Sequence, residues 1–443
     1  MRAHGQRLAR TRALAHSSRP LALLSASTFQ LFSNRSFALF WAARWFATLA
    51  VQMQLTAMGW QIYDASRAAG QSIEQAAFVL GLVGLAQFLP LLLLAPFGGQ
   101  LADRYDRKRI LVLCFAAKAV IAGGLTLFAA STPSVAAAAI FTAAVLSGVI
   151  NAFLPPAASA FMPMLVSRQE LPQAIAWSSL AFNSGLIIGP AIGGLAYGLA
   201  ASVPYVVALA LLVLGAALIA ALRAPRHQPQ ETAPALAMIV EGLVYVWRNK
   251  IVLGAISLDL IVVLLAGAVA LLPVFARDIL HAGPEELGIL RAAMGAGAAF
   301  VAMILAVRPI RTRVGLWMFG ATLAFGLATV VFGLSTHLWL TVAALAVAGG
   351  VDMISVYVRQ ALIQLATPDP MRGRVAAVSF VFISASNELG DFEAGLMARI
   401  FGPVSAVVIG GGAAMAAALG WMRLFPELAK ADRLEAAVNA AGA

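Results

Sequence analysis

Long apolar stretches, separated by short polar ones, fill most of this 443-residue chain. About 20 apolar residues suffice for a helix to cross the hydrocarbon core of a membrane. Twelve stretches reach or approach this length, which predicts twelve transmembrane helices. They lie at 37–60, 76–97, 110–130, 135–157, 174–199, 203–221, 251–275, 287–307, 316–334, 338–358, 375–400 and 404–421. The fourth stretch is interrupted by Pro155 and Pro156, and the eleventh carries three acids.

The composition supports a membrane protein. Hydrophobic residues make up 61% of the chain and charged residues only 11%, too few to cover the surface of a soluble protein of this length. The predicted fold class is therefore an all-α polytopic membrane protein with two six-helix halves.

The positive charges predict the orientation in the membrane, because Lys and Arg accumulate on the cytoplasmic side. With the N-terminus inside, the inside segments hold 24 of the 30 Lys and Arg residues. The outside segments and their edges hold four, namely Arg67, Arg277, Arg291 and Arg399. We therefore expect a bacterial inner-membrane protein with both termini in the cytoplasm. The net charge of +11 then faces anionic lipid and indicates no nucleic-acid partner.

The chain divides near its centre. We expect a cytoplasmic tail at 1–36, a first half at 37–222, a linker at 223–250, a second half at 251–422 and a tail at 423–443. Within the linker, residues 235–248 have the pattern of an amphipathic helix on the inner membrane face. The loops that follow the fourth and tenth spans are alike, which is typical of parallel halves. The basic, acid-free start is read as a disordered tail or an over-long gene start in preference to a transit peptide.

A motif lies between the second and third spans. It reads Gly-x-Leu-Ala-Asp-Arg-x-x-Arg-Lys from Gly99 to Lys108. Its glycines allow a tight turn or a close helix approach, and its Asp can accept hydrogen bonds at a helix N-terminus. The plain alternative is a loop of the positive-inside kind. The motif resembles a loop of the major facilitator superfamily, and this resemblance implies a latch between the halves in the outward-facing state. The latch would consist of Gly99, Asp103, Arg104, Arg107 and Lys108. Asp106 stands where that family usually has Gly.

The fifth span carries a second motif, with Gly185, Gly189, Pro190, Gly193 and Gly194. Glycines four residues apart leave a stripe without side chains that lets another helix pack closely. Ordinary helix packing accounts for part of this pattern. The motif also resembles the antiporter motif of exporters in the same superfamily, which implies export in preference to uptake.

Ionisable residues inside a membrane are costly and usually functional. Candidates for proton or substrate binding are Asp259, Asp352, Glu388, Asp391 and Glu393 in the second half, with Arg44, Lys118 and Gln52 in the first. Because the acids lie in one half and the bases in the other, we expect ion pairs across a central cavity. The alternative places Asp391 or Glu393 at the outer water boundary, with Arg44 reaching inward to water.

The resemblance extends over about residues 30–435, through segments such as Ala255–Leu260, Gln364–Arg374 and Ala385–Gly390. These segments look like the superfamily subgroup that contains the enterobactin exporter. The resemblance implies alternating access and secondary active export, and it does not fix the cargo. Our leading hypothesis is proton-coupled efflux of a siderophore-like metabolite or an amphipathic drug. We expect a monomer. An uptake permease of the same fold is the alternative, and a receptor or scaffold is disfavoured because the chain has no large soluble domain. No phosphate-binding loop or metal-ligand cluster is visible, so we expect neither enzymatic activity nor a cofactor.

Overall fold

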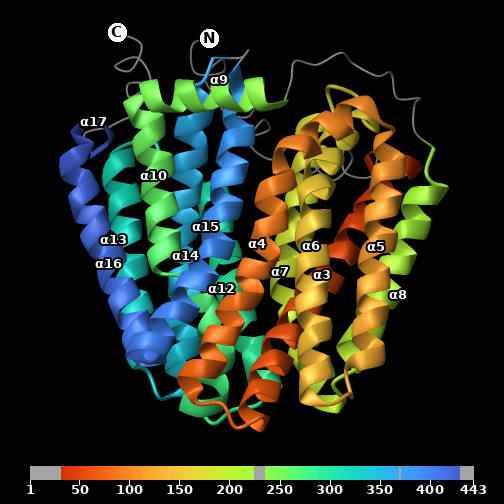
Figure 1. Ribbon diagram of the computed structural model, residues 1–443. Coiled ribbons are helices and arrows are strands. Elements are labelled where there is room, and N and C mark those ends of the chain that lie inside the picture. Colours follow the sequence, from red (N-terminus) through yellow and green to blue (C-terminus); the bar gives the residue numbers. More distant parts are fainter. Residues whose placement is uncertain (1–30, 224–234, 369–370, 430–443) are drawn as a thin grey trace, which may run out of the picture.

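The computed structural model describes residues 31–223, 235–368 and 371–429. Most of the predicted tails at 1–36 and 423–443, and much of the linker, lie outside these residues. Six long helices precede the linker (Figure 1). They are α3 (Arg35–Ala68), α4 (Ile73–Arg104), α5 (Arg107–Phe128), α6 (Pro133–Phe161), α7 (Leu171–Leu199) and α8 (Val203–Ala221), with the short η1 (Met162–Met164) after α6.

The second half begins with a broken helix and continues with five long ones. The broken helix consists of α10 (Lys250–Leu265), η2 (Ala268–Leu271), α11 (Leu272–Val274) and the π-helical η3 (Phe275–Ile279). The others are α12 (Pro284–Val307), α13 (Val314–Leu334), α14 (Leu338–Ala366), α15 (Arg372–Phe401) and α16 (Pro403–Leu424), followed by the short α17 (Pro426–Ala429). The all-α prediction is confirmed.

Ten helices of the described chain are long and apolar enough to cross a membrane by length and composition. Helices α3 and α15 are not among these ten, because polar and charged residues lower their hydropathy. Yet α3 packs along α7 and α8, and α15 packs along α4 and α10. Their place in the bundle is therefore set by their neighbours, which shield the polar groups.

The seventh predicted span is not one continuous helix. Helix α10 ends at Leu265, and Gly267 then lies so close to Gly390 that a Cβ atom on Gly267 would come within 2.6 Å of the Gly390 carbonyl oxygen. The break is followed by a π-helical turn that contains Arg277 and Asp278. π-Helical turns are often found at functional positions.

The fourth span, in contrast, continues as α6 through Pro155 and Pro156 to Phe161. Pro156 has no N–H to donate to the carbonyl of Ala152. A Cβ atom on Gly98 of α4 would come within 2.0 Å of that carbonyl oxygen. The glycine therefore lets α4 approach the exposed carbonyl, and neighbouring helices commonly stabilise prolines in membrane helices in this way.

The predicted amphipathic helix is present as α9 (Ala235–Arg248) and lies across the ends of the second-half helices (Figure 1). Glu241 forms an ion pair with Arg374 of α15, and Gly242 packs against the Arg374 backbone. On the other side, Val240 and Trp247 are exposed. A helix with an exposed apolar side at the end of a bundle suits a membrane surface.

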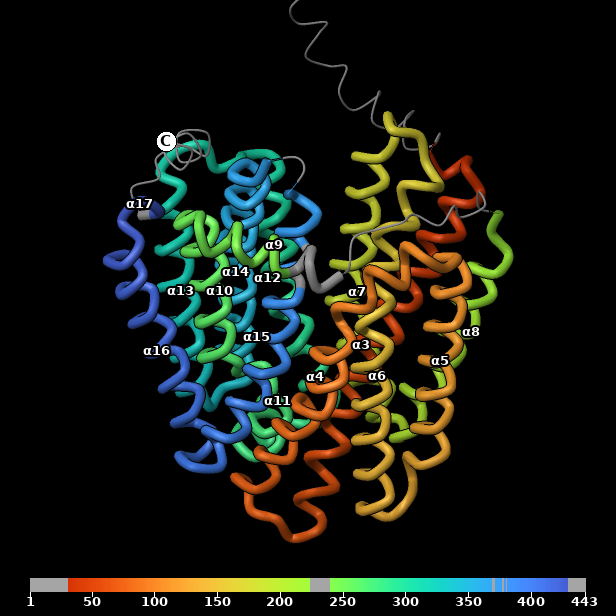
Figure 2. Tube along the Cα trace, turned by 45° about the horizontal axis from the view of Figure 1, so that its top comes forward, coloured from red at the N-terminus to blue at the C-terminus, as the bar shows by residue number. Residues whose placement is uncertain are grey.

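The two halves meet mainly through two pairs of helices, α4 with α15 and α7 with α12. Figure 2 shows the start of α4 lying against the second half, at the end of the molecule away from α9. We call the two ends the α9 end and the opposite end.

Candidate functional site

Helix α7 carries glycines on two faces. Gly185, Gly189 and Gly193 face α3, where added Cβ atoms would meet Thr48, Gln52 and Met53 at 2.5–2.8 Å. This face joins two helices of the same half. It also places the candidate Gln52 directly against the glycine stripe.

The second glycine face of α7 joins the two halves. A Cβ atom on Gly194 would lie 2.3 Å from the Pro284 carbonyl oxygen and 2.9 Å from Gly288 Cα, both in α12. Gly288 in turn packs on the carbonyl of Pro190. The exporter-like motif therefore lies in the contact between the halves, with backbone against backbone.

Helices α4 and α15 form the other contact in the same manner. Gly81 lies against Gly395, and Gly84 lies against the side chain of Asp391, where an added Cβ atom would be 2.9 Å away. The small residues bring a carboxylate of the second half up to the backbone of the first.

A partly buried charged cluster lies at this contact. Glu388 of α15 accepts a hydrogen bond from the Gln87 amide of α4, and Asp391 interacts electrostatically with both Glu388 and Arg291. The Arg291 guanidinium reaches α3, because a Cβ atom on Gly59 would lie 3.3 Å from it. Arg291, counted in the sequence as a residue at the outer edge, is thus part of the interface.

The other buried ion pair lies within the second half. Asp259 of α10 pairs with Arg359 of α14, and their side chains are 10% and 6% exposed. The expected pairs between these acids and first-half bases are not seen among the described residues. Lys118 instead donates to Asn151 at 3.0 Å, and Arg44 lies over the Phe40 ring. Lys118 and Asp259 each have a polar partner in their own half, so these two charges do not pair across the halves.

The remaining candidate acids are separate from these groups. Asp352 lies on α14 and Glu393 on α15. Among the described residues, neither forms a hydrogen bond or ion pair that would link the halves.

The loop motif joins elements of the first half. Arg107 donates to the carbonyls of Ala102 and Ala160 and pairs with Asp103 at 3.4 Å. Lys108 donates to the Leu222 carbonyl at 2.9 Å. Arg104 is exposed. Gly99 lies inside α4, where an added Cβ atom would meet nothing within 4 Å, so it forms no turn here. Asp106 caps α5 through the Lys108 N–H.

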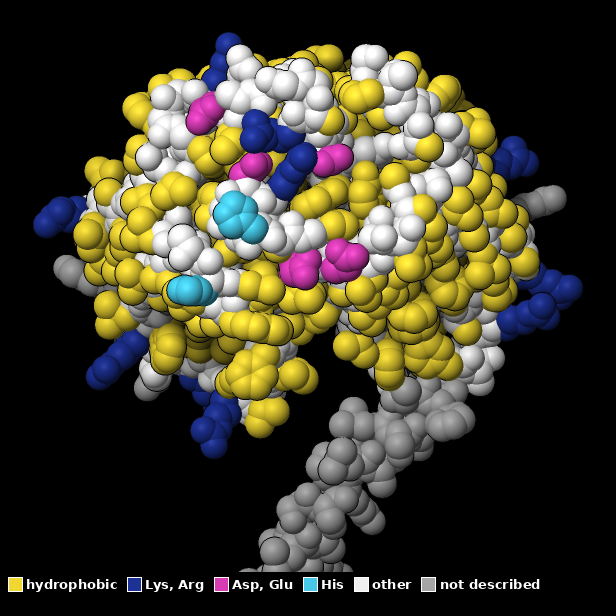
Figure 3. Space-filling view, turned by 90° about the horizontal axis from the view of Figure 1, so that it is seen from below, with side chains coloured by type: hydrophobic (Ala, Val, Ile, Leu, Met, Phe, Trp, Pro, Cys, Tyr) yellow, Lys and Arg dark blue, Asp and Glu magenta, His cyan; other side chains and the backbone are white. Residues whose placement is uncertain are grey.

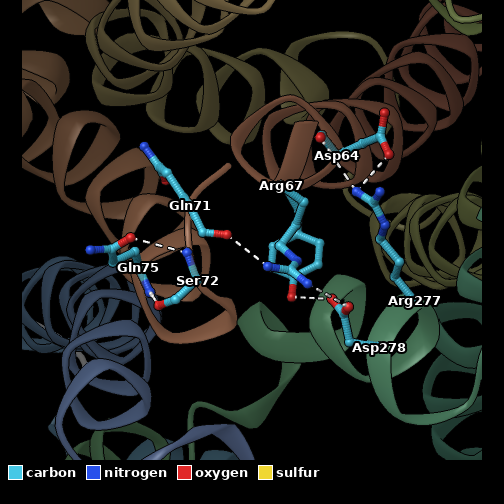
Figure 4. Close-up of polar contacts among 8 residues, drawn as sticks. Asp64, Arg67, Gln71, Ser72, Gln75, Arg277 and Asp278 are labelled. Atoms are coloured by element: carbon cyan, nitrogen blue, oxygen red, sulfur yellow. Dashed lines mark hydrogen bonds and ion pairs between the residues drawn. The ribbon is translucent and has the colours of Figure 1, made fainter. Parts of the chain in front are cut away.

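A polar network closes the opposite end. Figure 3 shows charged side chains gathered on the middle of that face, with apolar ones around them. Arg67 at the end of α3 pairs with Asp278 at 3.3 Å, and Arg277 pairs with Asp64 at 2.6 Å (Figure 4). Tyr63 also donates to Asp278. All these contacts cross between the halves.

The sequence reasoning did not identify this network. Its only signal was that Arg67 and Arg277 belong to the few basic residues of the predicted outside segments. A rare charge that departs from the positive-inside pattern can be a sign of a specific partner.

A cavity of about 620 Å³ opens between α14 and α15 near the α9 end. It lies in the same half as the Asp259–Arg359 pair, which lines a smaller cavity next to it. In the part of the chain that the structure describes, no group of His, Cys, Asp and Glu could hold a metal ion.

Two helical bundles that meet at one end, with charged side chains in the contact and a cavity within the second half toward the other end, have the architecture of a membrane transporter of the alternating-access type. Residues 26–440 match the family described as transmembrane secretion effector. The chain therefore belongs to this family of the major facilitator superfamily and is a multi-pass transporter of the inner membrane. The fold and family expected from the sequence are confirmed.

Known proteins support this placement. The chain is 32% identical to the enterobactin exporter EntS of Shigella boydii, over 72% of this chain and 75% of that one. It is 29% identical to the EntS of Citrobacter koseri, over 81% and 85% of the two chains. The crystal structure of a D-xylose–proton symporter superposes with a TM-score of 0.69 at 13% identity, covering 88% of this chain and 98% of the other. This last likeness shows the fold alone.

Proposed function

We propose that this transporter exports a siderophore-like molecule from the cytoplasm and that proton entry at the Glu388 cluster drives the export. The relatives named as enterobactin exporters support the cargo class. The observation that carries the coupling is the partly buried Glu388–Gln87 hydrogen bond, because it joins an acid of one half to the other half.

The orientation follows from the loops. The α9 end carries clusters such as Arg107 to Arg109 and Arg308 to Arg313, and basic loops remain in the cytoplasm. We therefore assign the α9 end to the cytoplasm and the opposite end to the periplasm. With the halves joined at the periplasmic end, this conformation faces the cytoplasm and is ready to take up cargo.

The coupling follows from a count of charges. Arg291 balances one of the two carboxylates Glu388 and Asp391, which leaves one net negative charge inside the interface. A proton on Glu388 makes the cluster neutral, and buried charge is unfavourable without compensation. A protonated cluster therefore favours the closed contact between the halves, whereas proton loss weakens it. A ligand shifts a conformational equilibrium only by such a difference between states.

The test uses proteoliposomes loaded with enterobactin, the cargo named for the relatives. We expect an imposed proton gradient to drive enterobactin efflux by the unaltered protein. Glu388→Gln keeps the size and a hydrogen bond to Gln87 but cannot exchange a proton. We expect it to lose gradient-driven efflux and to retain exchange of enterobactin down its own concentration gradient.

Glu427→Gln is the matched control, because Glu427 is an exposed acid outside the interface. It should respond to the gradient as the unaltered protein does. A Glu388→Gln variant that still accumulates cargo against its gradient would rule out coupling at this residue. Absence of enterobactin exchange by the unaltered protein would reject the cargo.

A further inference from the structure

The cavity at the α9 end has a polar rim and a mixed wall. Its lining includes Gln360, Ile363, Gln364, Ala376, Ser379 and Ile383. Gln360 and Gln364 are one helical turn apart on α14, so their side chains lie on one face. Its volume of about 620 Å³ is in the range of small-molecule pockets.

The smaller cavity next to it shares the walls Ile363, Ser379 and Ile383 and also contains Asp259 and Arg359. Three polar atoms that line this smaller cavity have no hydrogen-bond partner in the described structure. Arg359 Nη1 is the atom that forms the ion pair with Asp259, and the other two are Arg359 Nε and Ser379 Oγ. Arg359 is 5% exposed and Ser379 is 7% exposed. Buried donors without partners are rare in folded proteins, so two of them on one cavity wall indicate a missing partner.

The charges of Asp259 and Arg359 restrict the chemistry of that missing partner. The carboxylate of Asp259 already balances the charge of Arg359, yet the Nε–H still needs an acceptor. An added anion would leave the buried group with a net negative charge, which is costly in low dielectric. An uncharged oxygen, such as an amide or ester carbonyl, satisfies the donor without this cost.

We propose that Arg359 Nε and Ser379 Oγ bind an uncharged carbonyl oxygen of the cargo, while Gln360 and Gln364 contact its outer polar groups. This subsite rests on the proposed function and adds to it a chemical preference, for neutral amide- or ester-containing ligands over carboxylates. The apolar wall formed by Ile363 and Ile383 suits an aromatic or aliphatic part next to the carbonyl.

The test is protection of a single thiol. In a Cys114→Ala background, which removes the only cysteine, Ala376→Cys places a thiol in the wall of the larger cavity and keeps Arg359 and Ser379 intact. Inside-out membrane vesicles are treated with a positively charged methanethiosulfonate reagent. We expect the Ala376→Cys thiol to react, and enterobactin to slow the reaction by about tenfold or more, the size expected for hydrogen bonds to a charged group.

A matched pair of small ligands tests the charge preference. 2,3-Dihydroxybenzamide and 2,3-dihydroxybenzoate share the catechol ring and differ in the amide and the carboxylate. We expect the amide to protect at a lower concentration than the acid. Equal protection, or better protection by the carboxylate, would overturn the preference. A Gln169→Cys thiol, exposed in a first-half loop at the same end, should react equally with and without ligand.

The two proposals fail in different ways. If efflux of enterobactin is intact but neither it nor the amide protects the Ala376→Cys thiol, the subsite is wrong and the function stands. If the thiol is protected by the amide but the unaltered protein does not export enterobactin, the subsite stands and the cargo is wrong. A thiol that does not react would show that the cavity is closed to water, which also overturns the subsite.

Discussion

At the scale of single residues, the buried pair of Asp259 and Arg359 shows how charge is tolerated in the bundle. The two side chains are almost fully enclosed and come from neighbouring helices of one half. Taking either charge out of water is costly, and only the partner compensates for it. The pair therefore makes the packing of α10 against α14 depend on both members.

We predict that Asp259→Asn destabilises the protein more than removal of both charges does. The single change leaves the Arg359 guanidinium buried without a counter-charge, at a cost of about 3–5 kcal/mol. The double variant Asp259→Asn with Arg359→Gln should recover most of that loss. Thermal unfolding in detergent measures both. A double variant less stable than the single one would contradict this account.

At the scale of one element, α7 uses glycines for two different purposes. Gly193 packs on the Met53 backbone within the first half, whereas Gly194 packs on α12 of the second half. Adjacent residues of a helix point about 100° apart, so a single motif serves two partners. The Gly193 contact stabilises the fold of the first half, whereas the Gly194 contact lies between the halves, where transport requires opening and closing.

We predict that Gly193→Ala lowers the unfolding temperature, because overpacking a fixed contact costs about 1–3 kcal/mol. Gly194→Ala should instead lower the ratio of closed to open conformations at the contact between the halves. The decrease should be about tenfold if the overpacking cost is similar. The measurement is the distance between spin labels attached at Ala69 and Thr336 in a Cys114→Ala background. Both residues are exposed at the opposite end, one in each half, so this distance reports how far apart the halves are there.

Gly412→Ala is the control for both substitutions, since an added Cβ atom there meets nothing within 4 Å. It should change neither the unfolding temperature nor the spin-label distance. The same response from Gly193→Ala and Gly194→Ala would show that the two faces of α7 do not differ in role.

At the scale of the whole molecule, the halves are joined by glycine contacts along the helices and by ion pairs at the opposite end. Asp278 accepts from both Tyr63 and Arg67, so it is the centre of the network (Figure 4). Its side chain is 16% exposed. Partial exposure weakens ion pairs through water and salt, which suits a contact that has to open.

We predict that Asp278→Asn increases the open population at this end by about fivefold, corresponding to roughly 1 kcal/mol for a partly exposed pair. The exchange Arg67→Asp with Asp278→Arg should restore part of the closed population. The Ala69–Thr336 spin-label distance measures both. Glu241→Gln, which removes an ion pair within the α9 end, should leave that distance unchanged, and an unchanged distance in Asp278→Asn would refute the role of the network.

The sequence determined those features that follow from local composition. Apolar length predicted the helices, and the pattern of residues 235–248 predicted α9 with the same bounds. The motif glycines predicted close helix contacts. These signals are readable because a bilayer requires about 20 apolar residues per span and closely packed helices require small side chains.

The tertiary structure alone decided which polar groups meet. Asp259 pairs with a base of its own half, and Arg291 and Asp278 reach the first half from positions that looked peripheral. The break in the seventh helix depends on Gly390, a residue more than 120 positions away. Such contacts cannot be read from the chain because partners on different helices are set by packing and tilt, and many pairings satisfy the same charges equally well.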